Sequence, residues 1–261
     1  MRIFDIHTHV YPDAVAQKAT DSVKEFYGIP GAGLDGKVST LLQQGQKVGI
    51  SGYLILPVAI RPDRVHGIND YILQQTQLHP EFVGFGSVHV AMDGIGEEAR
   101  RIMDMGLKGI KMHPDCQRFH IDDPRLYPLY EAVAGKIPVM FHMGDQRYDY
   151  SHPLKLRKIL DQFPQLQAVA AHFGGYSMYE TAYEFLKDTD CIFDISSSIM
   201  FMEDGIPEKF INLYGAERMA YGTDYPLWDP AQEVERFLQL KLRLDQLEQI
   251  AWKTAHRFLK L

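Results

Sequence analysis

The chain has 261 residues, of which 46% are hydrophobic and 23% charged, as in an ordinary globular protein. The formal charge of −7 argues against a nucleic-acid partner, because acidic surfaces repel phosphate backbones. The N-terminus lacks the apolar core of a signal peptide, and no apolar run approaches the roughly 18 residues that span a bilayer. We therefore expect a cytoplasmic protein that makes no membrane contact.

Short apolar runs with β-forming residues alternate with longer amphipathic stretches along the whole chain. We expect eight strands, at residues 3–10, 52–59, 82–89, 107–113, 138–143, 168–173, 191–197 and 219–224. Strands that alternate with helices form a parallel sheet, and the length is typical of one (β/α)8 barrel. An open, doubly wound sheet would give the same alternation. Because no linker or shift in composition interrupts the chain, we expect one domain over residues 1–261.

Three helix starts are marked by local signals. Asp123-Pro124 and Asp229-Pro230 each place a capping residue before a proline that suits the first helical turn. Asp245 and Glu248 have the spacing of a capping box.

Residues 31–36 match the dinucleotide-binding pattern G-x-G-x-x-G. The pattern requires a strand before the loop and an acidic residue about 20 positions later, and neither is present. We interpret the segment as a flexible loop between the first strand and its helix, placed to cover the barrel mouth.

Chemistry-bearing residues gather where the expected strands end. The first strand carries His7 and His9, which face the same side because side chains alternate along a strand. Three later strands each end in one such residue: His142, His172 and Asp224. In a closed barrel these ends meet at one mouth, where barrel enzymes have their active sites. The pattern therefore predicts a metal site.

Imidazoles with a carboxylate suit zinc, and manganese, iron and cobalt are alternatives. A divalent metal with an open position lowers the pKa of bound water to about 7. Asp224 can then accept the water's proton, either as a ligand or from beside the metal.

Together with the phrases at residues 109–114 and 121–124, these residues resemble the amidohydrolase-related family, which includes aminocarboxymuconate-semialdehyde decarboxylase. The resemblance extends over the full length and implies a (β/α)8 barrel with one divalent metal. It implies His7, His9, His142 and Asp224 as ligands. It also implies that His172 orients water or polarises the substrate, so we expect His172 to matter more for turnover than for metal binding.

Lys111 lies two residues before His113 on the expected strand 107–113. A buried lysine is costly unless it is paired or modified. We favour a pair with Asp5. The alternatives are a carbamylated lysine that bridges two metals, and a rotated strand that turns Lys111 toward a helix. His113 is a candidate for substrate contact or for a supporting hydrogen bond.

Other residues follow strands on the same rim. Arg61 and Arg147 can clamp a substrate carboxylate, although nearby Asp63 and Asp145 can neutralise them. Asp194 is expected to be a hydrogen-bond acceptor inside the barrel. The candidates for substrate binding are His113, Lys111, Arg61, Arg147 and Tyr225, with His89 and His120 also near enough to reach the mouth.

Three functions fit this site. The first is hydrolysis of a small, carboxylate-bearing lactone, amide or ester by a metal-activated water. The second is non-oxidative decarboxylation of an unsaturated or aromatic carboxylate at the same metal. The third is a non-catalytic barrel that keeps its metal, which the open metal position disfavours. We expect a small-molecule substrate and leave a homo-oligomer open.

The two cysteines are expected to be free. Cys116 follows one strand at its C-terminal end, whereas Cys191 begins another strand at the opposite end of the barrel. Bridged cysteines need Cα atoms within about 7 Å of each other.

Overall fold

The computed structural model describes residues 1–29, 31 and 33–261. Within this part of the chain each expected strand overlaps an observed one, and only the second, expected at residues 52–59, begins later than the observed strand. The strands are β1 (Ile3–Thr8), β2 (Ile50–Ile55), β3 (Phe82–Gly84), β4 (Gly86–Ser87), β5 (Ile110–Met112), β6 (Val139–Phe141), β7 (Ala168–Ala170), β8 (Ile192–Asp194) and β9 (Met219–Ala220). Only Phe85 separates β3 from β4, so the two together form the third barrel strand.

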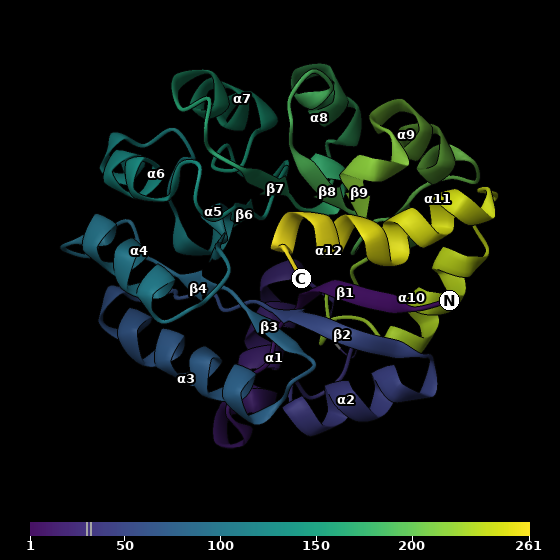
Figure 1. Ribbon diagram of the computed structural model, residues 1–261, viewed down its shortest axis with the longest axis horizontal. Helices are drawn as coiled ribbons and strands as arrows, with labels where there is room; N and C mark the ends of the chain where they lie inside the picture. Colours follow the sequence, from purple (N-terminus) through teal and green to yellow (C-terminus); the bar gives the residue numbers. More distant parts are fainter. Residues whose placement is uncertain (30, 32) are drawn as a thin grey trace.

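The strands form a closed ring. Every neighbouring pair is parallel, in the orders β1-β2-β3 and β4-β5-β6-β7-β8-β9. The last strand returns to β1, because Ile6 N donates to Tyr221 O and Asp224 N donates to His7 O, at 2.9 and 2.8 Å. The fold is therefore the expected (β/α)8 barrel and not an open sheet, as Figure 1 shows.

Helices surround the ring in Figure 1. They are α1 (Asp13–Tyr27), α2 (Val38–Lys47), α3 (Val65–Leu78), α4 (Ile95–Asp104), α5 (Pro114–Gln117), α6 (Tyr127–Val133), α7 (Pro153–Gln162), α8 (Tyr179–Leu186), α9 (Ile206–Tyr214), α10 (Pro230–Leu238), α11 (Leu244–Glu248) and α12 (Thr254–Leu259). Among the described residues, no helix combines the length and the apolar character that a bilayer crossing requires.

Two of the three predicted helix caps are confirmed. Asp123 accepts a hydrogen bond from Arg125 N, and Asp229 accepts one from Ala231 N. The predicted box at Asp245 is wrong, because α11 begins one residue earlier, at Leu244.

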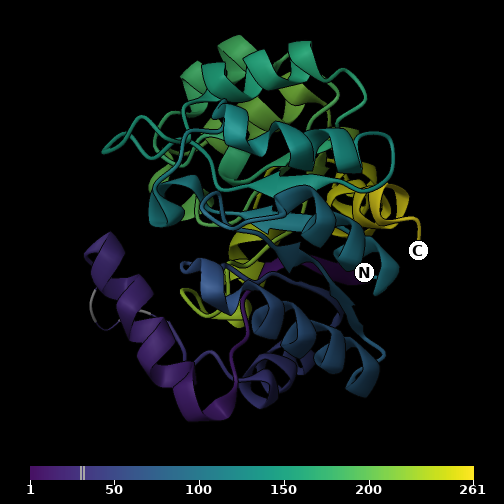
Figure 2. The same cartoon turned by 90° about the vertical axis from the view of Figure 1, so that its left-hand side faces the viewer.

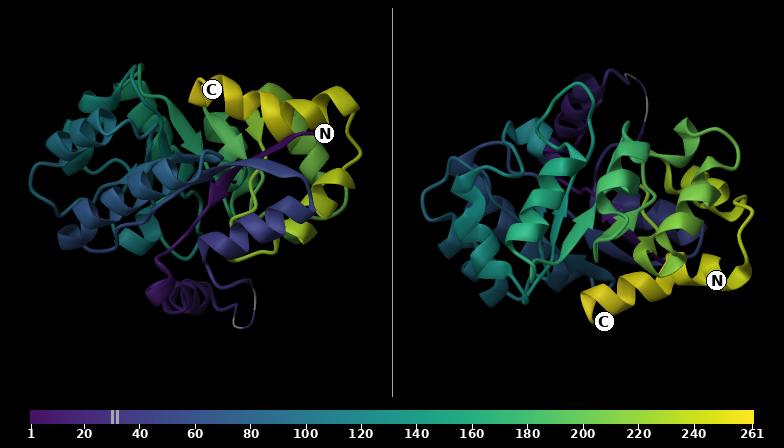
Figure 3. Two further views of the ribbon diagram at one scale, coloured as in Figure 1. Left: turned by 60° about the horizontal axis from the view of Figure 1, so that its bottom comes forward. Right: turned by 90° about the horizontal axis from the view of Figure 1, so that it is seen from above.

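The two ends of the barrel differ in the polarity of their side chains. At the N-terminal end of the strands, Ala255 and Leu259 of α12 pack against Phe4, Leu54 and other apolar residues inside the ring. This plug leaves the opposite end for polar side chains. Figure 2 places α1 and the C-terminal helix on opposite sides of the ring, and Figure 3 shows α1 standing apart from the other helices.

Strand β1 contains a bulge close to this mouth. Asp5 pairs with Tyr53 and Thr8 with Ile55, so three steps along β1 match two steps along β2. An extra residue of this kind breaks the regular alternation of side chains. Asp5 consequently bonds to Thr223 Oγ1 and to His7 N, at 2.6 and 3.0 Å, and not to Lys111.

The glycine-rich segment does not follow a strand. Helix α1 precedes it and ends at Gly28 in the left-handed conformation. Ala32 of the motif lies outside the described residues. Leu34 N donates to Pro226 O at 2.7 Å, which ties the segment to the loop after β9. The rejection of a dinucleotide site stands, but the segment connects α1 to α2 and does not connect the first strand to its helix.

Cys116 and Cys191 are both free, as predicted. Cys116 lies in α5 beyond the end of β5, and Cys191 immediately precedes β8.

Gly144 lies where two strand ends approach each other closely. Its φ is +73°, and a Cβ at this position would lie 2.4 Å from Gly175 Cα. Gly106 has a similar φ of +85° but open space around it.

We expect Gly106→Ala to lower the free energy of unfolding by about 1 kcal/mol, through backbone strain alone. Gly144→Ala should cost a further 1–3 kcal/mol or so, because backbone atoms must also move apart. Urea denaturation of both variants measures the difference. Equal losses would show that the close approach at Gly144 has no energetic weight.

Candidate metal centre at the barrel mouth

Three predicted ligands converge on one point. His7 Nε2 and His9 Nε2 lie 3.4 and 3.5 Å from the same atom, Asp224 Oδ1. Donor atoms held by a tetrahedral metal through bonds of about 2.1 Å lie roughly 3.4 Å apart. The three side chains also form one of the groups of potential metal ligands among the described residues. The donor set therefore fits a divalent metal.

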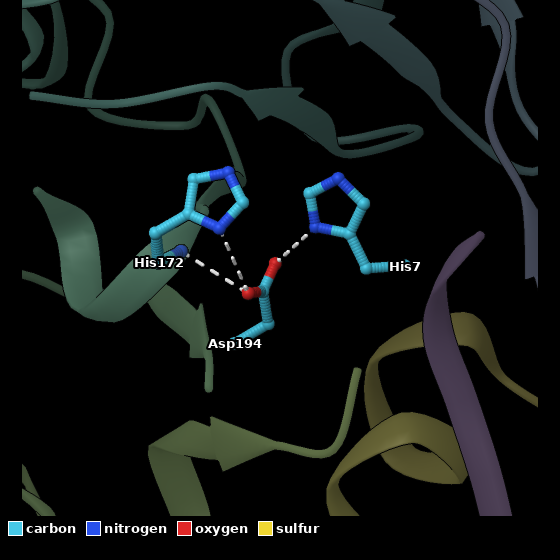
Figure 4. Close-up of side chains that lie close together, drawn as sticks. All are labelled: His7, His172 and Asp194. Carbon is cyan, nitrogen blue, oxygen red and sulfur yellow. Dashed lines mark hydrogen bonds and ion pairs between the residues drawn. The ribbon is translucent and has the colours of Figure 1, made fainter. Parts of the chain in front are cut away.

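Asp194 holds His7 from behind. His7 Nδ1 lies 2.8 Å from Asp194 Oδ2, as Figure 4 shows. Burial by itself raises the pKa of Asp194, but His7, His172 and the Ser196 hydroxyl together hold it well below its ordinary value. Burial, aided by Lys111, also lowers the pKa of His7 to about 4. His7 is thus a neutral imidazole that donates from Nδ1 and offers the lone pair of Nε2.

His9 is in the same tautomeric form as His7. Its Nδ1 lies 2.7 Å from the carbonyl oxygen of Leu56, which can only accept a hydrogen bond. The proton is therefore on Nδ1, and the Nε2 lone pair faces Asp224. A histidine whose second nitrogen is engaged in this way is the usual form of a metal ligand.

His142 and His172 form a linked pair. His172 Nδ1 donates to the carbonyl oxygen of Ser196, and His172 Nε2 lies 3.0 Å from His142 Nδ1. Because His172 Nε2 carries the lone pair, His142 must donate from Nδ1, which leaves its own Nε2 free. His142 does not join the group of His7, His9 and Asp224. It is grouped with His113 and Asp115 instead.

The favoured pair of Lys111 with Asp5 is wrong, because the bulge in β1 turns Asp5 toward Thr223. The side chain of Lys111 is fully buried, and its Nζ lies 3.2 Å from His7 Nε2. The strand is therefore not rotated toward a helix. Burial lowers the pKa of Lys111 to about 8, although Asp194 and Asp224 act in the opposite direction.

Tyr27, the last residue of α1, reaches the mouth. Its hydroxyl lies 2.8 Å from His113 Nε2 and 3.4 Å from His142 Nε2. The rings of His113 and His142 are stacked, with centroids 4.0 Å apart. His113 is thus near the site, but Tyr27 stands between it and the opening.

The space beside these residues is small. A cavity of about 20 Å³ is lined by His142, His172 and Asp224. Its lining also includes the aromatic side chains of Tyr27, Tyr176, Phe201 and Trp228. A volume of this size is about that needed for one water molecule.

Three predicted substrate contacts do not face this cavity. Arg61 is 63% exposed and bonds twice to Asp63. Arg147 is likewise held by Asp145, and it also donates to the carbonyl oxygen of Phe26 on α1. The Tyr225 hydroxyl donates to Lys37 O at 2.8 Å, on the side of α2. Local ion pairs and the turn after β9 account for these differences.

The two further histidines are also engaged away from the cavity. His89 Nδ1 accepts a hydrogen bond from Ala91 N. His120 lies against Tyr150 and near Asp149.

Several residues at the site were missed by the sequence-based prediction: Tyr27, Tyr176, Ser196, Ser197, Phe201 and Trp228. The run Ser196-Ser197-Ser198 begins two residues after the end of β8, and polar residues at that end of a strand were a usable signal. No local signal marks Tyr27 or Trp228, because tertiary packing alone brings them to the mouth.

Comparison with known proteins bears on the family and the fold. The family profile described as "Amidohydrolase" matches residues 4–261. The 2-amino-3-carboxymuconate-6-semialdehyde decarboxylase of Dictyostelium discoideum is 23% identical over an aligned length of 205 residues. The match covers 63% of this chain and 56% of that protein. The chain thus spans little more than half the length of this curated relative.

Solved structures share the fold. An uncharacterised TIM-barrel protein from Bordetella bronchiseptica is 20% identical with a TM-score of 0.82, and the match covers 100% of this chain and 99% of the other. A dihydroxybenzoic acid decarboxylase from Polaromonas, solved with manganese and the inhibitor 2-nitroresorcinol, is 15% identical with a TM-score of 0.76, over 99% and 97% of the two chains. The profile match covers almost the whole chain, and the resemblance noted in the sequence is confirmed: the protein belongs to the amidohydrolase family.

Proposed function

We propose that the protein is a metal-dependent, non-oxidative decarboxylase of a small aromatic or unsaturated carboxylate. The sequence favoured hydrolysis, with decarboxylation as the alternative. The relatives support the alternative better, since both the Dictyostelium and the Polaromonas proteins are named decarboxylases.

The cavity wall carries the proposal. Its lining combines potential metal ligands and ionisable side chains with the rings of Tyr27, Tyr176, Phe201 and Trp228. Aromatic rings pack well against flat, unsaturated molecules. Among the described residues, neither an arginine nor a lysine lines this cavity, and we propose a bound metal ion as the main partner for a substrate carboxylate.

We propose that His7, His9, His142 and Asp224 hold one divalent metal, with manganese and zinc as the first ions to test. A bound metal supplies positive charge that binds the carboxylate-bearing substrate and stabilises negative charge as the reaction proceeds. His142 lies outside the group of the other three, so its ring would have to turn toward Asp224 to join them.

The remaining chemistry is proton transfer. The bond from the substrate carbon to its carboxylate breaks, the electron pair stays on that carbon, and carbon dioxide leaves. One proton then takes the place of the carboxylate. Asp224 and His172 line the cavity, and we assign proton transfer to this pair.

The substrate needs more room than the cavity offers, since ligand sites usually enclose about 300–1,000 Å³. Tyr27 is the wall residue that α1 carries, and α1 is held at this end by Arg147. We therefore propose that the end of α1 moves outward when the substrate enters.

Hydrolysis remains the second candidate because of the state of Asp224. Asp224 Oδ2 accepts a hydrogen bond from the Ser197 hydroxyl, and a hydrogen bond donated to a carboxylate favours its ionised form. An ionised carboxylate beside the metal position can accept a proton from a water molecule, as hydrolysis requires.

The metal assignment predicts one equivalent of divalent metal per chain. His9→Ala should lose it, because the variant lacks a direct ligand. His89→Ala is the matched control, since His89 is also a largely buried histidine near a strand end but bonds only to Ala91 N. Elemental analysis of the folded variants decides the matter, and full metal retention in His9→Ala would refute the assignment.

The proposed reaction predicts release of carbon dioxide and uptake of one proton per turnover. A panel of hydroxybenzoates, unsaturated carboxylates, lactones, esters and amides separates the two candidates. Release of carbon dioxide that requires the metal supports decarboxylation. Metal-dependent hydrolysis of the neutral members, without carbon dioxide, would replace it with the second candidate.

Two substitutions of His172 should separate its effect on turnover from its effect on metal binding. His172→Gln keeps an oxygen that can accept from His142 Nδ1, so it should retain metal and lose about 10²–10⁴-fold in kcat. His172→Ala loses that acceptor and should also bind metal about 10–100-fold more weakly. Metal content and kcat are measured on the same preparations. Normal kcat in the metal-loaded Gln variant would exclude a role in proton transfer.

A further inference from the structure

The two oxygens of Asp224 have different surroundings. Oδ1 faces the imidazole nitrogens of His7 and His9. Oδ2 accepts a hydrogen bond of 2.5 Å from the hydroxyl of Ser197, which follows β8. The carboxylate therefore presents one oxygen to the metal position and keeps the other occupied.

A third residue fixes the direction of this contact. Trp228 Nε1 lies 2.8 Å from Ser197 Oγ. An indole nitrogen can only donate, and an ionised carboxylate can only accept. The single hydroxyl hydrogen of Ser197 must then point to Asp224, while its oxygen accepts from Trp228. The two hydrogen bonds therefore run in one direction only, from Trp228 to Ser197 and from Ser197 to Asp224.

The backbone at Ser197 supports a functional role. Its φ is +50°, and the two site residues His172 and Asp224 have φ values of +59° and +60°. The left-handed conformation costs a non-glycine residue about 1–2 kcal/mol, and such strain concentrates at functional sites. Glycine would adopt this conformation without strain, so the presence of serine here has an energetic cost that its hydroxyl group has to offset.

We propose that Ser197, supported by Trp228, is a positioning residue that makes Asp224 a ligand through one oxygen only. Rotation of the carboxylate about its last torsion is soft, because that torsion has broad, nearly two-fold preferences. Without the hydroxyl, both oxygens can turn toward the metal and fill the position that the substrate needs. This inference rests on the metal site of the proposed function.

Trp228 also lines the substrate cavity, where its ring packs edge-on against Phe201 with centroids 5.7 Å apart. One side chain thus belongs to the aromatic wall and to the hydrogen-bonded support of Asp224. A substrate that shifts the indole changes the donor available to Ser197.

The test uses Ser197→Gly, which removes the hydroxyl and also relieves the backbone strain. The metal-free variant should therefore unfold at the same temperature as the wild type or above it. Its affinity for Mn²⁺, measured by chelator competition, should fall about 10–100-fold, because the carboxylate is no longer held in place before the metal binds and this loss outweighs the contact of a second oxygen. After Co²⁺ substitution, its visible absorption bands should shift, because the ligand arrangement around the metal has changed.

Ser198→Ala is the matched control. Ser198 is equally buried and adjacent, but its hydroxyl donates to the carbonyl oxygen of Ser196 at 2.8 Å and does not touch Asp224. It should keep the wild-type Mn²⁺ affinity and Co²⁺ spectrum. Trp228→Phe removes the indole N–H and should shift both readouts in the same direction as Ser197→Gly, by less.

Two outcomes would overturn the inference in different ways. Wild-type affinity and spectrum in Ser197→Gly, while the wild-type protein binds one metal, would refute the role of Ser197 and leave the proposed function intact. Failure of the wild-type protein to bind metal would remove the metal site and this inference together. A larger effect in Trp228→Phe than in Ser197→Gly would contradict the order of the three residues.

Discussion

The mouth of this barrel depends on the carboxylate of Asp194. This fully buried group accepts four hydrogen bonds, from His7 Nδ1, His172 N, Ser196 N and Ser196 Oγ. A buried charge is costly unless its hydrogen bonds are made, and here they come from the ends of three strands. The same contacts that stabilise the charge hold β1, β7 and β8 in a fixed relation. They also set the protonation of His7, since a nitrogen that donates to Asp194 leaves the opposite nitrogen free for a metal.

The strained backbone residues of the site and the apolar packing that stabilises the fold lie at opposite ends of the barrel. The backbone is left-handed at three residues that follow strands at the mouth: His172, Ser197 and Asp224. Conformations of this kind persist only where surrounding contacts hold them. The closed hydrogen-bonded ring supplies that support, and α12 fills the opposite end with apolar side chains. Variation at the mouth can therefore change the chemistry while the plugged end continues to hold the barrel together.

Periodicity was enough to predict eight parallel strands, and the strand-end residues were enough to predict the convergence of His7, His9 and Asp224. Closure of the sheet into a barrel followed from the chain length and the family resemblance, because the alternation of strands and helices fits an open sheet equally well. The Lys111–Asp5 pair failed because one extra residue in β1 breaks the alternation that the prediction assumed. Arg61 and Arg147 bond to acidic residues two positions away, which local sequence suggested but could not decide. Tyr27 was beyond prediction, since only the path of α1 across the mouth brings it to His113.

The charges around His7 suggest the order in which the site fills. Two ionised carboxylates, Asp194 and Asp224, and the ammonium of Lys111 surround a neutral imidazole, so these groups carry a net charge of −1. An anionic substrate is repelled by such a site in a poorly solvated setting. A divalent metal held by the proposed ligands would reverse the sign to +1, and a single substrate carboxylate would then neutralise it. Such a metal would also displace Lys111 from the lone pair of His7 and leave its ammonium to face an incoming anion. Under the proposed function, metal binding would therefore come before the binding of a carboxylate-bearing substrate.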